Sequence, residues 1–186
     1  MEALFASIAL VALAEIGDKT QLLSLALAAK YKRPLPILAG IAIATLLNHA
    51  LAGALGAWVT GVVGPQVLQA ILAVSFLAMA AWMLVPDKLD LAEATGRFGV
   101  LATTTVAFFL VEMGDKTQVA TVALAAKYSA FYTVVAGTTI GMLLANAPVV
   151  VFGERLLRRL PVRLVQRIAA MVFAVVGVLA GVQVLA

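Results

Sequence analysis

The chain has 186 residues, of which 64% are apolar and 12% are charged, and its mean hydropathy is +1.10. Soluble domains contain about 45–50% apolar and about 25% charged residues, and a protein this small could not bury so much apolar surface. The composition therefore excludes a water-soluble domain and a disordered chain, and it predicts an all-α polytopic membrane protein. With no cysteine and one histidine, His49, disulfides, thiolate metal sites and multi-histidine clusters are also excluded.

Proline, glycine and charge clusters divide the chain into six apolar stretches. A helix needs about 20 apolar residues to cross a bilayer. The predicted transmembrane helices cover residues 2–29, 37–61, 66–85, 98–126, 130–153 and 164–185.

Basic residues indicate the orientation of these helices. Ten of the 13 lysines and arginines fall in the loops after the first, third and fifth predicted helices or in the first turn beyond them, and the opposite loops hold only Lys127. The ten are Lys30, Lys32, Arg33, Lys88, Arg97, Arg155, Arg158, Arg159, Arg163 and Arg167. By the positive-inside rule those loops are cytoplasmic, so both termini are expected to be extracytoplasmic. We expect an integral protein of a bacterial cytoplasmic membrane whose environment is the lipid bilayer, and the net charge of +4 does not indicate nucleic-acid binding.

A polar motif occurs twice. Residues 15–31 read EIGDKTQLLSLALAAKY and residues 112–128 read EMGDKTQVATVALAAKY, with 12 of 17 positions identical at an offset of 97. Three predicted helices per copy invert the second copy relative to the first, as in inverted-topology transporters. The predicted organisation is a three-helix repeat over 1–85, a cytoplasmic linker over 86–97 and a second three-helix repeat over 98–186.

The motif places charged groups near the middle of the first and fourth predicted helices. A charge at the bilayer centre costs about 2.5–3.5 kcal/mol on insertion scales, so it indicates a function. Carboxylates three residues apart share a helix face, and amides follow one turn later. Oxygen-rich clusters of this kind suit hard divalent cations such as Ca²⁺, Mg²⁺ and Mn²⁺. The predicted metal ligands are Glu15, Asp18, Gln21, Glu112, Asp115 and Gln118.

Other polar and small residues of both repeats are candidates for supporting or pathway roles. The glycines permit close backbone approach or a helix break that frees carbonyl ligands. His49 and Asn146 match at the repeat offset, and they either bind a neighbouring helix or line the ion site, where His49 could relay a proton. The full set is Gly17, Lys19, Thr20, Ser24, Asn48, His49, Gly114, Lys116, Thr117, Thr121 and Asn146.

Two interpretations of the motif charges remain open. In the structural one, Glu15 pairs with Lys19 and Glu112 with Lys116 along each helix. In the functional one, the four carboxylates and two lysines sum to −2, which one divalent cation or two protons would neutralise. Mutually exclusive loading of these ions would make an electroneutral antiporter without a resident cofactor.

The doubled E-x-G-D-K-T motif, over residues 15–20 and 112–117, resembles that of the GDT/MneA family of cation exchangers. The resemblance implies export of Mn²⁺, with Ca²⁺ as a second candidate ion, in exchange for protons, and it implies that the motif acids bind the cation. The alternatives are an exporter of another cationic solute, such as a basic amino acid, and a non-transporting membrane assembly factor. The sequence contains no hydrolase or metalloprotease motif, so nothing in it indicates an enzyme. It leaves open whether the protein is a monomer or a homodimer.

Overall fold

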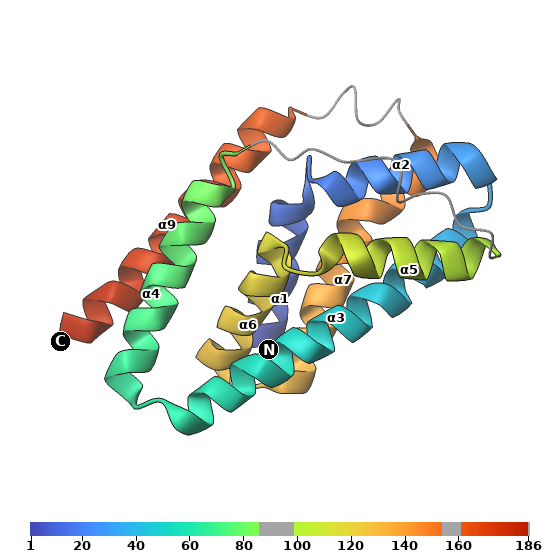
Figure 1. Cartoon of the computed structure of the whole chain (residues 1–186). Helices are drawn as coiled ribbons and strands as arrows, with labels where there is room; N and C mark the ends of the chain where they lie inside the picture. The colour runs from blue at the N-terminus through green and yellow to red at the C-terminus, as the bar shows by residue number, and fades with distance from the viewer. Residues whose placement is uncertain (86–98, 154–160, 186) are drawn as a thin grey trace.

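A computed structural model describes residues 1–85, 99–153 and 161–185, and every regular element in these ranges is an α-helix (Figure 1). The helices are α1 (Glu2–Glu15), α2 (Lys19–Tyr31), α3 (Pro34–Val62), α4 (Pro65–Trp82), α5 (Val100–Glu112), α6 (Lys116–Tyr128), α7 (Phe131–Phe152) and α9 (Val162–Leu185). The predicted all-α membrane class is confirmed, because α3, α4, α7 and α9 are each long and apolar enough to cross a bilayer. The predicted linker 86–97 lies outside the described residues, as do Lys88, Arg97, Arg155, Arg158 and Arg159.

The first and fourth predicted helices are not continuous, which corrects the prediction of single helices over 2–29 and 98–126. Each is divided at the motif into a pair of shorter helices of 13 or 14 residues, α1 with α2 and α5 with α6. The motif glycines take positive φ angles, +82° at Gly17 and +77° at Gly114, which L-residues other than glycine rarely adopt. Figure 1 shows that α2 leaves α1 at a steep angle and that α6 leaves α5 in the same way.

Corresponding helices of the two halves pack in corresponding ways. The helix α1 lies against α7, and its counterpart α5 lies against α3. Both contacts bring a glycine close to a small polar residue: a Cβ added at Gly137 would lie 2.8 Å from Ser7 Cβ, and one added at Gly40 would lie 2.7 Å from Thr104 Cβ. These positions are related by the 97-residue offset of the motif, so the sequence repeat extends into the helix packing.

The remaining pair, α4 and α9, pack along each other at one side of the molecule (Figure 1). The helix α4 contacts α6, and α9 contacts α1. The helix α3 contacts α5, α6 and α7. The four motif acids, at the broken ends of these helices, are each at most 2% exposed, so the acids of both motifs lie in the interior.

Candidate cation site

Each motif forms a tight turn that its own glutamine closes. The backbone N–H of Asp18 donates to the carbonyl of Glu15 at 3.0 Å, and Asp115 donates to Glu112 at 3.0 Å. The amide oxygen of Gln21 accepts the N–H of Gly17 at 2.9 Å, and that of Gln118 accepts the N–H of Gly114 at 2.7 Å. Both predicted glutamine ligands thus hold the turn through the same oxygen that would bind a metal. Their role as ligands stays a prediction.

The helix ends add their own electrostatics to the site. Glu15 and Glu112 are the last residues of α1 and α5, where the helix dipole is negative and the final carbonyls lack intrahelical partners. A carboxylate at that end is unfavourable unless a cation lies nearby. Asp18 and Asp115 are the N-caps of α2 and α6, where a negative charge is favoured. The two glutamates are therefore the groups that most require a cation.

Carboxylates from both halves converge. Oxygens of Glu15, Glu112 and Asp115 all lie within 4.8 Å of one another, and the three residues are 0%, 0% and 2% exposed. Such a group of buried oxygens is suited to a divalent cation. The fourth predicted acid, Asp18, is buried but lies outside this group of three. The helix break does not distinguish Asp18, because Asp115 follows an equivalent break and still belongs to the group.

The lysines pair across the two halves. The Nζ atom of Lys116 lies 2.5 Å from Asp18 Oδ1, and that of Lys19 lies 3.0 Å from Asp115 Oδ1. The first pair is almost wholly buried, whereas the Lys19 side chain is 23% exposed. Glutamate and lysine of one motif were also candidates for pairing along a continuous helix. That interpretation is wrong, since each glutamate ends one helix and the lysine begins the next.

Hydroxyl groups hold the glutamates in place. Thr20 donates a hydrogen bond to Glu15 Oε2, and Thr117 donates to Glu112 Oε2 at 3.1 Å. Thr121 extends this set by donating to the carbonyl of Thr117 at 2.8 Å. Both threonines beside the glutamates are fully buried, so the carboxylates are oriented by groups of their own motif.

Other predicted supporting residues link neighbouring helices. Ser24 of α2 donates to Asn146 Oδ1 of α7 at 2.7 Å, and Asn48 Nδ2 of α3 donates to the carbonyl of Phe109 in α5 at 2.9 Å. Within α7, Asn146 Nδ2 also donates to the carbonyl of Met142 at 3.1 Å. His49 lies in the site itself, with its Nε2 atom 3.8 Å from Glu112 Oε2.

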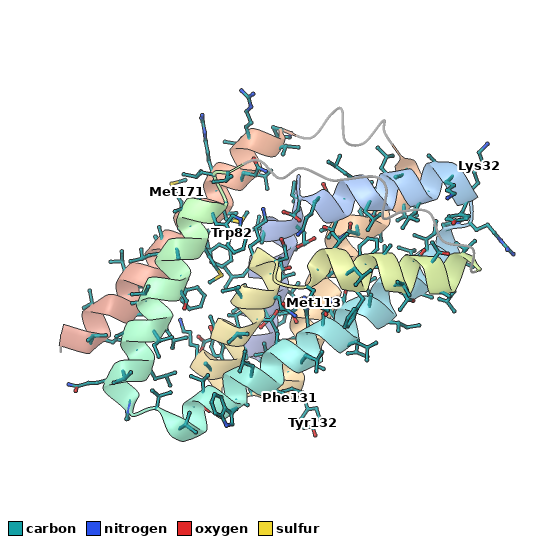
Figure 2. The ribbon with its side chains drawn as sticks, viewed as in Figure 1. Lys32, Trp82, Met113, Phe131, Tyr132 and Met171 are labelled. Carbon is teal, nitrogen blue, oxygen red and sulfur yellow. The ribbon has the colours of Figure 1, made fainter. Side chains whose placement is uncertain are left out.

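The two motif turns differ in whether another helix packs against them. A Cβ added at Gly17 would lie 2.1 Å from Val162 Cγ1 and 3.3 Å from Gln166 Nε2 of α9, whereas one added at Gly114 would meet nothing within 4 Å among the described residues. Figure 2 shows Met113 at the open turn between α5 and α6, and its side chain is 55% exposed. Sequence reasoning did not select Gln166, which borders the Gly17 turn and matches Gln69 at the same 97-residue offset.

We expect Gly17→Ala to destabilise the protein more than Gly114→Ala. Both alanines would carry the strain of a positive φ, about 1–2 kcal/mol, but only the Gly17 methyl would collide with Val162. Thermal unfolding in detergent would measure the difference, and Val162→Ala in the Gly17→Ala background is expected to restore part of the loss. Equal losses at the two glycines, or no restoration by Val162→Ala, would contradict this packing argument.

Known proteins resemble this chain over nearly its whole length. The sequence model of the family described as "Divalent cation/proton antiporter GDT1" matches residues 3–91 and 100–186. A protein of Vibrio cholerae serotype O1 named "Putative manganese exporter" is 51% identical over 174 residues, which cover 93% of this chain and 87% of that protein. No solved structure matches the chain. The chain therefore belongs to the GDT1 family of divalent cation/proton antiporters and is an integral membrane transporter, not an enzyme.

Proposed function

We propose that the protein exports Mn²⁺ in exchange for protons, with Ca²⁺ as a second candidate ion. The cation would bind the buried oxygens of Glu15, Glu112 and Asp115, which lie within 4.8 Å of one another. This convergence of acids from both motifs is the observation that carries the proposal. The name of the Vibrio relative supports Mn²⁺ as the ion, and oxygen ligands are those that Mn²⁺ and Ca²⁺ prefer.

The ion pairs refine the charge balance of the exchange. The Lys19–Asp115 and Lys116–Asp18 pairs each sum to zero, which leaves the two glutamates with a charge of −2. One divalent cation would neutralise both glutamates, and so would two protons. We therefore propose that one M²⁺ exchanges for two protons without net charge movement.

We further propose that the two halves form an inverted pair of three-span repeats, each with one broken span. The shared order of helices and the matching contacts of α1 with α7 and of α5 with α3 support this arrangement. The Tyr128 hydroxyl donates to Glu2 Oε1 at 3.3 Å, so the start of the chain lies beside the α6–α7 turn. Both segments are predicted to lie on the extracytoplasmic side, and this contact supports their lying on the same side of the membrane.

The test is ion flux into proteoliposomes under an imposed pH gradient. We expect wild-type protein to move Mn²⁺ when the gradient is applied and Glu15→Gln to abolish that movement, because one of the two glutamate charges is lost. Glu2→Gln is the matched control, since it removes a carboxylate from the same helix α1 at its exposed end. A voltage-sensitive dye would report net charge movement, which would contradict the proposed stoichiometry.

Parallel assays separate the alternatives. Flux of a labelled basic amino acid in place of Mn²⁺ would favour export of another cationic solute. Folded wild-type protein that moved no ion under any gradient would favour an assembly factor. Mn²⁺ flux that survived in Glu15→Gln would show that the cation binds elsewhere.

A further inference from the structure

His49 occupies an unusual position for a buried histidine. It lies in α3 and is 0% exposed, and neither ring nitrogen has a hydrogen-bond partner among the described residues. Its Nε2 atom is directed at Glu112, 3.8 Å from Oε2, which is too far for a hydrogen bond. A buried polar group without a partner costs free energy, so it calls for an explanation such as a bound water or ion.

The equivalent residue of the other half provides an internal comparison. Asn146 matches His49 at the 97-residue offset and is also fully buried. Its side chain is satisfied, because Oδ1 accepts from Ser24 and Nδ2 donates to the carbonyl of Met142. The same position is thus a helix-to-helix contact in one half and an unpartnered ring aimed at the acids in the other.

The distances allow His49 and Glu112 to bind the same ion. Two donor atoms that each lie about 2.1 Å from a small divalent ion are at most about 4.2 Å apart, and Nε2 and Oε2 are 3.8 Å apart. Glu112 is itself one of the three acids whose oxygens lie within 4.8 Å of one another. His49 therefore adds a nitrogen atom to an otherwise all-oxygen group.

We propose that His49 Nε2 is a ligand of the transported ion and that it makes the site favour Mn²⁺ over Ca²⁺. The inference rests on the proposed function, which places the ion at the motif acids. Ca²⁺ binds oxygen ligands almost exclusively, whereas imidazole nitrogen binds divalent transition metals. Since nitrogen affinity rises from Mn²⁺ towards Co²⁺, Co²⁺ competes with Mn²⁺ at this site better than Ca²⁺ does.

Pulsed electron paramagnetic resonance of the Mn²⁺-loaded protein tests the ligand directly. His49 is the only histidine of the chain, so untagged protein grown with histidine ¹⁵N-labelled in its ring carries the label at one residue. We expect a ¹⁵N coupling to bound Mn²⁺ in the labelled wild-type protein and a ¹⁴N coupling in its place in unlabelled protein. This measurement needs no substitution and does not depend on whether a variant folds.

Binding measurements on His49→Gln test the selectivity. We expect its Kd for Mn²⁺ to rise at least about tenfold, while its Kd for Ca²⁺ changes by less than about threefold. His49→Asn, which introduces the residue found at the equivalent position of the other half, is a second variant with the same expected result.

The outcomes separate this inference from the proposed function. Bound Mn²⁺ without a histidine nitrogen coupling overturns the inference and leaves the oxygen site intact. Equal losses of Mn²⁺ and Ca²⁺ affinity in both variants overturn the selectivity role. Failure of wild-type protein to bind Mn²⁺ at all overturns the proposed function, and the inference with it.

Discussion

Replacement of Glu112 by glutamine is expected to weaken Mn²⁺ binding by more than about 100-fold. Loss of a group that only orients a ligand costs about 10–100-fold in metal affinity, and Glu112 is one of the three converging acids themselves. It is also one of the two glutamates that remain once each motif lysine is paired with an aspartate. The same substitution is expected to abolish flux driven by a pH gradient.

Titration calorimetry of detergent-solubilised protein with Mn²⁺ would measure this loss. Glu2→Gln controls for a general effect of removing a carboxylate, because Glu2 is exposed. Thermal unfolding of the variant in the absence of metal would show whether the fold survives. Near-normal affinity in a folded Glu112→Gln protein would exclude this acid from the cation site.

The aspartates of the two motifs are expected to differ in their effect on folding. Asp18→Asn removes the charge 2.5 Å from the Lys116 ammonium, whose side chain is only 2% exposed. Breaking a buried ion pair from one side costs about 3–5 kcal/mol. Asp115→Asn is expected to cost less, because its partner Lys19 is 23% exposed and can be hydrated. It also removes one charge from three crowded carboxylates, which relieves repulsion.

Unfolding in detergent and Mn²⁺ titration together test this difference. We expect Asp18→Asn to lose mainly stability and Asp115→Asn to lose mainly Mn²⁺ affinity. In the double variant Asp18→Asn/Lys116→Met, an apolar side chain of similar length replaces the lysine, and most of the stability is expected to return. Equal stability losses in the two single variants would contradict the assigned ion pairs.

The amino-acid sequence is sufficient for the class of protein and for most of the site. Its composition excludes a soluble domain, and its doubled motif selects Glu15, Glu112 and Asp115 as candidate ligands. These inferences hold because a charge in hydrocarbon is so costly that its presence in an apolar stretch indicates a function. The same motif includes Thr20 and Thr117, which hydrogen-bond to the glutamates.

The sequence does not determine how the motif residues are shared between the two halves. The prediction that Glu15 and Asp18 share a helix face is wrong, because the helix breaks at Gly17, where φ is +82°. A glycine within an apolar stretch can be accommodated in a continuous helix, at some cost in stability. Its presence therefore shows that a break is possible, not that one occurs.

The sequence repeat by itself determined that there are two equivalent motifs. Only the tertiary structure decided that the two motifs have different surroundings and contribute different residues to the site. Three features depend on contacts between residues distant along the chain. Each motif lysine pairs with the aspartate of the other motif, α9 packs over Gly17, and His49 lies near Glu112. Spacing along a helix fixes which side chains share a face of that helix. It does not fix which helices meet, because that depends on how all of them pack together.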